Sequence, residues 1–430
     1  MLRRDDDPGR LKFALSRFEN SIVLTAVLMD RSNRSTGECA LLNAQSIATD
    51  RGEAFAEGIR SLLRREDSSP TVAVRVIVGT SDEDDNEDEI AAAILVEGVW
   101  HPVADVFVEG APGRRVWQHG REPIQPSVPP DRVARLTSSF GTQAWQRLRR
   151  SSVAVIGAGG TGSVAIPTLA RAGVGRLVIV DDDRISASNL ERTHASFPEH
   201  VDKRTLKVEL ARDHVRSIDP ETELVALNGR LPQREIVEEV ASCDMVIGCT
   251  DSHTSRMAVA DMARRFLVPA LDCGGLIEGA HGNVTGQIVQ LVRFGTDDPC
   301  PRCRGMIDPV RIAQELMSVE ERERLATEHP NDTPPEAHEV PQIDTVGYIT
   351  TVSGTLAAGY AIGLLTGRFA PPFERMQMNL VAPLLGVTDR PQDFSPNCDC
   401  RRARGLGDLG ADYAPFAVPP HWPSVRPITS

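Results

Sequence analysis

Residues 153–181, VAVIGAGGTGSVAIPTLARAGVGRLVIVD, contain the pattern that decides the fold. A short apolar run, Val153–Ile156, leads into a glycine-rich turn, and the turn leads into a helix-compatible segment, Thr161–Ala172. A second apolar run, Leu177–Val180, follows and ends at Asp181. Strand, glycine turn, helix and strand in this order form a βαβ unit, which implies a parallel sheet. We therefore predict an α/β protein with a doubly wound, mostly parallel sheet.

Helical and apolar segments continue to alternate on both sides of this unit. Each predicted helix returns the chain to the next strand of the same sheet. The charged, proline-bearing stretch 305–340 is predicted to form a helical excursion and a mobile loop. We predict helices over Arg132–Arg150, Lys207–Ile218, Gln233–Ala241 and Ser255–Phe266, and strands over Glu223–Leu227, Met245–Gly248 and Pro269–Cys273.

Residues 10–121 are predicted to form a separate, smaller α+β domain. The segment 122–131, EPIQPSVPPD, holds four prolines, which cannot continue a helix or a central strand, so we predict a linker there. Residues 132–402 then form the nucleotide-binding domain, and 403–430 lack periodicity and are expected to be an irregular tail. Within the first domain we predict a helix over Gly52–Arg65 and strands over Ile22–Met29, Thr71–Val78, Ile90–Glu97 and Val103–Val108.

Composition disfavours several classes of partner. The chain has 430 residues and a formal net charge of −13. This charge disfavours non-specific binding to nucleic acid and docking on an anionic membrane. The start, MLRRDDDPGR, lacks the apolar core of a signal peptide, and the apolar stretch 345–367 contains too much Thr, Gly and Ser for a spanning helix. We expect a soluble cytoplasmic protein in which 345–367 forms a buried helix.

The glycine turn predicts a nucleotide site. Gly157, Gly159 and Gly162 give the pattern G-x-G-x-x-G between a strand and a helix, with Gly160 inside it. Glycines let the backbone turn sharply and approach phosphates, and the helix N-terminus offers free N–H groups. Asp181 lies about 20 residues beyond, where an acidic residue meets ribose hydroxyls. These features leave NAD and ATP equally open.

Charged residues at later strand ends favour ATP. Arg192, Lys207 and Asp251 follow in order, and lysine is rare, since only Lys12, Lys203 and Lys207 occur among 47 basic residues. A triphosphate needs cations around its oxygens and a carboxylate to hold its metal ion, whereas hydride transfer does not. We predict that Arg192 and Lys207 neutralise phosphate oxygens and that Asp251 holds Mg²⁺ through oxygen.

Four motifs in order carry a resemblance to a known family. They are GAGGTG from residue 157, VDDDRISASNLER from 180, KVELARDHVRSIDP from 207 and GCTDSHTSR from 248. Upstream, residues 132–141 fit the pattern R-x-x-R-x-x-x-x-F-G. Over about residues 132–400 the chain resembles the ubiquitin-activating-enzyme-like (ThiF/MoeB/HesA) adenylyltransferases, which have a doubly wound α/β fold and are usually dimeric.

The resemblance implies a role for each matching residue. Arg135 would be an arginine finger that reaches the phosphates in the partner subunit's site. Lys203 is a rival for the role of Lys207, because the spacing from Arg192 is slightly longer than in the family; we prefer Lys207, since KVELARD begins there. Asp251 would hold Mg²⁺, and the nucleotide would contact Gly157, Gly159, Gly160, Gly162, Asp181, Asp183, Asn189, Arg192 and Lys207.

Four cysteines suggest a structural zinc site. Cys300 and Cys303 form one close pair, and Cys398 and Cys400 form another. Four thiolates in two pairs suit tetrahedral Zn²⁺. The family usually has C-x-x-C twice, so the C-x-C spacing of the second pair is a departure that still permits chelation.

The cysteine that accepts the acyl group in some family members is missing. Residues 304–397, and hence the matching segment 338–347, contain no cysteine. Cys273 follows a strand near the nucleotide, but a buried core thiol is its more ordinary role. Either the adenylate passes directly to an external acceptor, or a hydroxyl forms an ester, for which the candidates are Thr345, Thr350, Thr351 and Ser353.

The implied activity is ATP-dependent adenylation of the C-terminal carboxylate of a ubiquitin-like protein, in a bacterial conjugation or defence pathway, with release of pyrophosphate. Sulfur-carrier activation in cofactor biosynthesis and peptide modification are alternatives, and a homodimer and a conjugating-enzyme partner are further expectations. An NAD-dependent oxidoreductase and a catalytically silent scaffold are the rival classes. Residues 10–121 occupy the place of a JAB/MPN isopeptidase-like domain in known fusions, but they hold only His101 and His119 and no H-x-H pair, so such a domain would be inactive.

Overall fold

The computed structural model describes two parts of the chain. In the first, it describes the backbone of eight strands between residues 10 and 118. In the second, it describes residues 128–280, 283–295, 298–328, 345–381, 386–389, 393–398, 400 and 416–428. The two parts belong to separate compact units. The predicted helix at 52–65, residues 122–127 of the predicted linker, and the stretches 329–344 and 401–415 lie outside the described residues.

The N-terminal unit contains two sheets. The larger has the strand order β3-β2-β1-β7-β8, and the smaller has the order β4-β5-β6. All four predicted strands match an observed one to within a few residues, while β1, which pairs with both β2 and β7, was not predicted. The strands are β1 (Arg10–Phe18), β2 (Ser21–Met29), β3 (Leu42–Asn43), β4 (Ala73–Gly79), β5 (Glu89–Val96), β6 (Val99–Pro102), β7 (Asp105–Glu109) and β8 (Arg115–Gln118).

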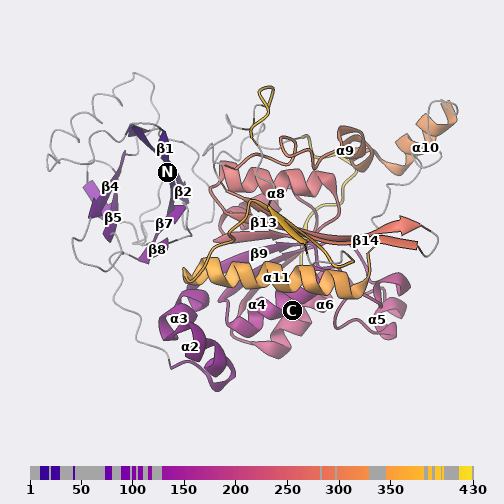
Figure 1. Cartoon of the computed structure of the whole chain (residues 1–430), viewed down its shortest axis with the longest axis horizontal. Helices are drawn as coiled ribbons and strands as arrows, with labels where there is room; N and C mark the ends of the chain where they lie inside the picture. The colour runs from indigo at the N-terminus through magenta and orange to yellow at the C-terminus, as the bar shows by residue number, and fades with distance from the viewer. Residues whose placement is uncertain are drawn as a thin grey trace. The chain divides into compact units, whose positions relative to one another are not determined.

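A nine-stranded mixed sheet forms the centre of the second unit (Figure 1). Its order is β16-β15-β14-β13-β12-β9-β10-β11-β17. The run from β13 to β11 is parallel, and antiparallel strands extend it at both ends. The strands are β9 (Ser152–Ile156), β10 (Arg176–Val180), β11 (Glu223–Asn228), β12 (Met245–Gly248), β13 (Ala270–Ala280), β14 (Asn283–Phe294), β15 (Arg375–Asn379), β16 (Gly386–Asp389) and β17 (Arg426–Pro427).

Helices cover both faces of this sheet, which confirms the doubly wound prediction. Helices α4, α6 and α11 lie on one side, and α8 lies on the other (Figure 1). The helices are α2 (Ala134–Phe140), α3 (Thr142–Arg150), α4 (Gly162–Ala172), α5 (Pro198–Asp202), α6 (Lys207–Ile218), α7 (Arg234–Ala241), α8 (His253–Arg265), α9 (Pro309–Leu316), α10 (Val319–Glu328) and α11 (Gly347–Thr366), with short 3-10 turns η2 (Asp131–Val133) and η3 (Ala187–Asn189).

Burial on both faces explains the short apolar runs of the sequence. Every residue of β9 and of β12 is buried, so neither strand shows the alternation of a half-exposed strand. Each buried Val, Leu or Ile side chain stabilises the fold by about 1.5–3 kcal/mol. Strand β10 lies on one side of β9 and β12 on the other, so the chain reverses its direction of travel across the sheet there. Ligands of open α/β sheets bind at such a point, outside the carboxyl ends of the strands.

The apolar stretch 345–367 forms the core helix α11, as predicted. By length and composition α11 could cross a membrane, but 12 of its 20 residues are buried within this unit. A methyl group at Gly354 would lie 2.4 Å from the Thr161 carbonyl oxygen, so the glycine allows α11 to pack closely on α4. Likewise, a methyl group at Gly275 would lie 2.3 Å from the Ile349 side chain. The small residues of α11 therefore serve close packing.

Two predictions about the shape of the chain need correction. The helix predicted over 132–150 is broken at Gly141, whose φ of +88° is a conformation that favours glycine, and it becomes α2 and α3. The predicted irregular tail is ordered over 416–428, because β17 pairs with the edge strand β11. A two-residue strand is too short to carry a hydrophobic period, so no pattern predicts it.

Candidate functional site

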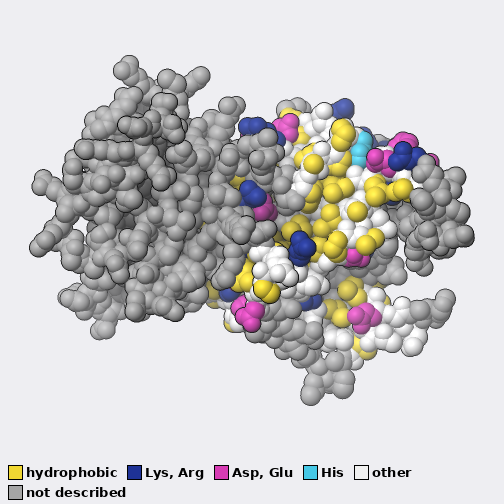
Figure 2. Space-filling model, turned by 90° about the horizontal axis from the view of Figure 1, so that it is seen from above, with side chains coloured by type: hydrophobic (Ala, Val, Ile, Leu, Met, Phe, Trp, Pro, Cys, Tyr) yellow, Lys and Arg dark blue, Asp and Glu magenta, His cyan; other side chains and the backbone are white. Residues whose placement is uncertain are grey.

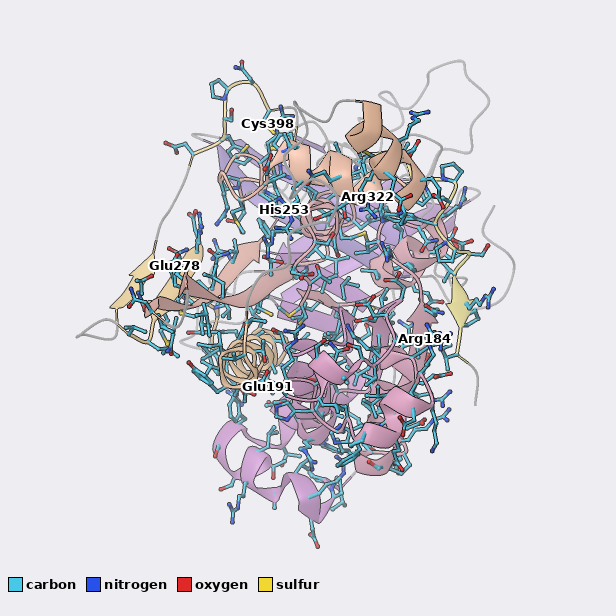
Figure 3. The ribbon with its side chains drawn as sticks, turned by 90° about the vertical axis from the view of Figure 1, so that its right-hand side faces the viewer. Arg184, Glu191, His253, Glu278, Arg322 and Cys398 are labelled. Carbon is cyan, nitrogen blue, oxygen red and sulfur yellow. The ribbon has the colours of Figure 1, made fainter. Side chains whose placement is uncertain are left out.

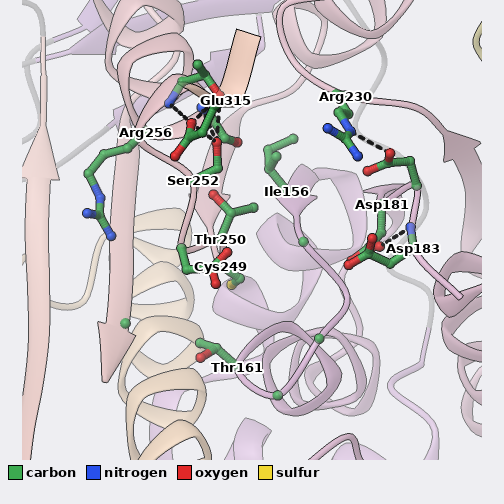
Figure 4. A pocket seen from close by; sticks show the side chains of 18 of the residues that line it. Ile156, Thr161, Asp181, Asp183, Arg230, Cys249, Thr250, Ser252, Arg256 and Glu315 are labelled. Atoms are coloured by element: carbon green, nitrogen blue, oxygen red, sulfur yellow. Dashed lines mark hydrogen bonds and ion pairs between the residues drawn. The ribbon is translucent and has the colours of Figure 1, made fainter. Parts of the chain in front are cut away.

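A cavity of about 1020 Å³ lies at the carboxyl ends of the parallel strands. Figure 4 shows Asp181, Asp183 and Arg230 on one side of Ile156, and Cys249, Thr250 and Ser252 on the other. The glycine turn, the acids after β10 and the segment after β12 all contribute to its wall. The cavity thus occupies the reversal point of the sheet, where the fold places a nucleotide.

The geometry of the glycine turn requires glycine at two of its positions. Gly157 has a φ of +96°, and a methyl group there would lie 2.7 Å from the Cys249 carbonyl oxygen. A methyl group at Gly162 would lie 1.9 Å from the Gly157 carbonyl oxygen. A side chain at Gly162 would push α4 away from the end of β9, and a side chain at Gly157 would collide with the segment that follows β12. The turn therefore keeps the N-terminus of α4 bare and close to the cavity, as phosphate binding requires.

Asp181 fastens the glycine turn to the end of β10. Its carboxylate accepts hydrogen bonds from the backbone N–H of Ala158 at 2.6 Å and of Asp183 at 2.8 Å. Burial raises the pKa of the Asp181 carboxyl to about 6; the Lys207 ammonium opposes this shift, and the Asp183 carboxylate adds to it. The two carboxylates lie together at the strand end, where ribose hydroxyls would reach them.

Lys207 lies at the first position of α6 and points toward the glycine turn. Its Nζ is 2.8 Å from Asp183 Oδ2 and 3.8 Å from where a methyl group at Gly159 would be. Burial disfavours the ammonium form, but the carboxylates of Asp181 and Asp183 more than offset it and raise the pKa of Lys207 above its ordinary value. Lys203, at the end of α5, is exposed and does not line the cavity, so the geometry favours Lys207 for the phosphates.

Arg192 and Asn189 reach the cavity from the segment after η3. The Asn189 side chain accepts a hydrogen bond from the Ser186 backbone N–H at 3.1 Å, so its amide oxygen also holds this turn. The Arg192 guanidinium lies 3.5 Å from the Thr345 carbonyl oxygen and lines the same cavity as Lys207. Arg192 is therefore placed where an anion in the cavity can displace a weak backbone contact.

Asp251 lies just beyond the end of β12 and is exposed in the cavity wall. Among the described residues its carboxylate makes no hydrogen bond, although its charge contributes to raising the pKa of Lys207. A carboxylate without a protein hydrogen-bond donor suits a hard cation such as Mg²⁺. The fold thus brings Arg192, Lys207 and Asp251 to the glycine turn, while Arg135, on α2, is exposed and lies outside the cavity of its own chain.

Helices α9 and α10, which form the predicted helical excursion, line the other side of the cavity. Glu315 of α9 accepts hydrogen bonds from the backbone N–H groups of His253 and Thr254, at the N-terminus of α8. Burial opposes ionisation of Glu315, but these donors and the Ser252 hydroxyl lower its pKa below the usual value. Glu315 is 62 residues from His253, and no local pattern predicts the contact.

The excursion also presents apolar side chains. Val310 of α9 and Val319 of α10 are 64% and 56% exposed. Figure 2 shows apolar side chains gathered across the described surface seen from above, interspersed with a few basic and acidic ones. Arg322 and His253 lie at the same end of the molecule, near α9 and α10 (Figure 3). The cavity is therefore bordered on this side by a partly apolar surface rather than by charge alone.

Sequence comparison agrees with this geometry. The ThiF family model matches residues 132–402. The chain belongs to the ThiF family. The matched residues include the whole parallel sheet, the glycine turn and all four cysteines of the predicted metal site.

Named relatives of this ThiF-family chain cover part of it. The SAMP-activating enzyme E1 of Haloferax volcanii is 35% identical over 175 residues, which are 40% of this chain and 61% of that protein. The adenylyltransferase and sulfurtransferase uba4 of Pyricularia oryzae is 29% identical over 287 residues, 65% of this chain and 50% of that protein. The chain thus spans less than two thirds of the length of either relative.

A solved structure is similar at lower sequence identity. The crystal structure of E. coli MccB with MccA-N7isoASN is 15% identical, covers 64% of this chain and 75% of that one, and superposes with a TM-score of 0.49.

The ThiF-family domain has a metal-binding geometry at its four cysteines. The Sγ–Sγ distances are 3.7 Å from Cys300 to Cys303, 3.6 Å from Cys300 to Cys398 and 3.8 Å from Cys303 to Cys400. Four sulfurs at about 2.3 Å from one tetrahedral Zn²⁺ would be about 3.8 Å apart. The four thiols therefore fit zinc, and the C-x-C spacing does not prevent chelation. Cys398 lies far from Arg184 and Glu191 (Figure 3), so this cluster is separate from the nucleotide end of the cavity.

The candidate acyl acceptors are placed differently by the fold. Ser353 is fully buried, and Thr351 is hydrogen bonded to the Gly347 carbonyl oxygen and to His194. Thr345 and Thr350 line the cavity, and the Thr350 hydroxyl donates to the Gly347 carbonyl oxygen at 2.9 Å. Cys273 also lines the cavity, but it is only 1% exposed and its thiol lies 3.6 Å from Cys249. Of the four candidate hydroxyl residues, Thr345 and Thr350 are thus the two that line the cavity.

Proposed function

We propose that this chain uses ATP to adenylate the C-terminal carboxylate of a ubiquitin-like protein. One observation carries the proposal. Arg192, Lys207 and Asp251, which lie far apart in sequence, line a single cavity together with the glycine turn. A dinucleotide has no terminal phosphate for these groups to neutralise, so the arrangement supports ATP over NAD.

Each part of the proposed reaction has a residue or group in the cavity that would serve it. A carboxylate oxygen of the partner forms a bond to the α-phosphorus, and the bond from that phosphorus to the bridging oxygen of the β-phosphate breaks. Pyrophosphate leaves with the electron pair, and no proton has to be removed, because a carboxylate is already ionised near neutral pH. Arg192 and Lys207 neutralise the charge that builds on the leaving oxygens. The glycine turn aligns the nucleotide so that the attack proceeds in line.

Asp251 fits a magnesium site. Its exposed carboxylate lies at the strand end that faces the glycine turn and has the oxygen donors that Mg²⁺ prefers. When bound, the ion would supply positive charge to the departing pyrophosphate. The Asp251 carboxylate makes no hydrogen bond to any described residue, which supports this role.

The nature of the acyl partner is a proposal drawn from the relatives. One similar protein is named for activating SAMP, and the other is named an adenylyltransferase and sulfurtransferase. We propose a small protein with a flexible, glycine-ending tail that reaches the cavity past α9 and α10, and we propose a bacterial conjugation or defence pathway over sulfur transfer. Peptide modification would need the same cavity and a shorter partner.

An exchange assay tests the reaction. The protein is incubated with ATP, Mg²⁺, labelled pyrophosphate and small proteins that end in glycine and are encoded beside it. Label entering ATP only when one of these proteins is present supports adenylation of that partner. Label entering ATP with none of them, together with binding of NAD but not of ATP, would contradict the proposal.

We also propose that the protein is a homodimer in which Arg135 serves the partner's cavity. Arg135 is exposed on α2 and outside its own cavity, as a residue acting in a second subunit would be. Mixing Arg135→Ala with Lys207→Ala would restore one complete site in each mixed dimer, or about a quarter of all sites. If each variant is inactive and the mixture remains inactive, Arg135 does not act in the partner.

A further inference from the structure

The segment Phe416–Ile428 is fastened to the edge of the sheet beside the cavity. Strand β17 pairs with β11, and the Ile428 backbone N–H donates to the Ala226 carbonyl oxygen at 2.8 Å. The Gln233 side chain donates to the Pro423 carbonyl oxygen at 2.7 Å. The same Gln233 side chain accepts a hydrogen bond from the Arg230 backbone N–H at 2.7 Å. The segment therefore has a fixed position next to the turn that follows β11.

This attachment brings an aromatic wall to the cavity. His421, Trp422 and Pro423 line it together with Gly229, Arg230 and Leu231. The Arg230 guanidinium lies 5.6 Å from the centre of the Trp422 ring. On its other side, Arg230 Nε lies 2.5 Å from Asp182 Oδ2. Arg230 is thus held between the acids after β10 and the ring of Trp422.

The wall lies at one definite end of the cavity. Phosphates belong at the glycine turn, where the N-terminus of α4 and Lys207 are found. The ribose belongs at the acids after β10. A nucleotide carries its base on the side of the ribose away from the phosphates. Arg230 lies on the same side of the cavity as Asp181 and Asp183 (Figure 4). Because Arg230 contacts both Asp182 and Trp422, the C-terminal segment lines the cavity beyond these acids.

We propose that Trp422, positioned by Arg230, forms the base-binding wall of the nucleotide site and packs against the purine ring. The inference rests on the proposed function, because it takes the ligand to be ATP. Aromatic side chains provide flat apolar surfaces on which a base can stack. The C-terminal segment would thereby select a nucleoside triphosphate over a bare polyphosphate, a role that the glycine turn and Lys207 do not perform.

The test uses the full chain and two probes, Mg·ATP and inorganic tripolyphosphate. Tripolyphosphate has the phosphates but no base, so only the affinity for ATP should depend on Trp422. We expect Trp422→Ala to weaken ATP binding about tenfold and to leave tripolyphosphate binding within twofold, with Trp422→Phe close to wild type. Ser424→Ala is the matched control, since Ser424 is exposed in the same segment and outside the cavity. ATP should also quench tryptophan fluorescence in the wild type but not in Trp422→Phe.

The outcomes separate this inference from the function on which it rests. Unchanged ATP affinity in Trp422→Ala, or an equal loss for both probes, would overturn the base-binding wall while leaving the ATP site intact. A wild-type protein that binds neither probe would overturn the proposed function, and the wall with it. Equal thermal unfolding midpoints for Trp422→Ala, Trp422→Phe and Ser424→Ala would exclude a general loss of structure.

Discussion

The two ends of the cavity are built in different ways. At the phosphate end, the glycine turn, Arg192, Lys207 and Asp251 follow elements that alternate regularly along the chain. At the base end, Asp182 and Arg230 also follow parallel strands, β10 and β11, but Trp422 comes from the C-terminal segment, nearly 200 residues from Arg230. The first end is set by the order of strands, because parallel strands bring their carboxyl ends to one edge. The base end depends on the C-terminal segment, which can pair with β11 only once the sheet has formed.

The difference predicts a gradient of effects. Groups at the phosphate end would contact oxygens whose charge changes during the reaction. Groups at the base end would contact a neutral ring whose charge stays the same. Variants of the first end should therefore affect the reaction rate most, and variants of the second should affect nucleotide affinity modestly.

The largest effect is expected at Asp251. Replacing it with alanine removes the proposed Mg²⁺ ligand, and we expect pyrophosphate exchange to fall at least ~1000-fold. Asp213→Ala is the control, because Asp213 is an acid of α6 whose side chain is 61% exposed and outside the cavity. Exchange in Asp251→Ala within tenfold of wild type would remove Asp251 from the metal site.

Lys207 should have the next largest effect. Lys207→Ala removes the ammonium beside Gly159, and we expect ATP affinity to fall about 100-fold. Lys203→Ala should stay within twofold of wild type, because Lys203 is exposed at the end of α5. Calorimetric titration of both variants compares the two lysines directly, and a larger loss in Lys203→Ala would reverse the assignment.

Asp181 should make nucleoside binding depend on pH. With a pKa of about 6, it is about one tenth ionised at pH 5 and about nine tenths ionised at pH 7. The ionised form accepts hydrogen bonds from ribose, so affinity rises with pH. Adenosine is the suitable probe, because its ribose is intact and it carries no phosphate to titrate. We expect up to about tenfold tighter adenosine binding at pH 7 than at pH 5, and a flat profile in Asp181→Asn. A slope that persists in Asp181→Asn would assign the titration to another group.

Arg230 should show a smaller effect limited to the base end. Arg230→Ala leaves Trp422 without the guanidinium that positions it, and we expect ATP affinity to fall about threefold to fivefold with no change for tripolyphosphate. Arg234→Ala, on the first turn of α7, is the control, since its side chain is 68% exposed. A loss of tripolyphosphate binding in Arg230→Ala would place Arg230 at the phosphates instead.

Metal removal at the cysteine cluster should change nucleotide affinity least. We expect about one zinc per chain by elemental analysis, and its loss in Cys398→Ser. The unfolding midpoint of that variant should fall by roughly 5–10 °C, because a structural metal contributes folding free energy, while ATP affinity stays within about twofold. Cys243→Ala, which alters a cysteine outside the cluster, should retain the metal. Zinc retained in Cys398→Ser would show that the four thiols do not form the site.

The sequence by itself determined the parallel sheet, the glycine turn and the residues of the phosphate end. These depend on local spacing: apolar runs separated by helical periods, and polar groups just after a strand. Such signals survive without knowledge of distant contacts, which explains why α6 was predicted with its observed bounds, Lys207–Ile218.

Only the tertiary structure decided the capping of α8 by Glu315 and the place of Trp422. Each depends on contacts between segments that share no period, such as Gln233 with Pro423 or Glu315 with His253. A docked two-residue strand and a long-range helix cap are stabilised by partners that exist only once the sheet has formed, so their own residues carry no pattern that announces them.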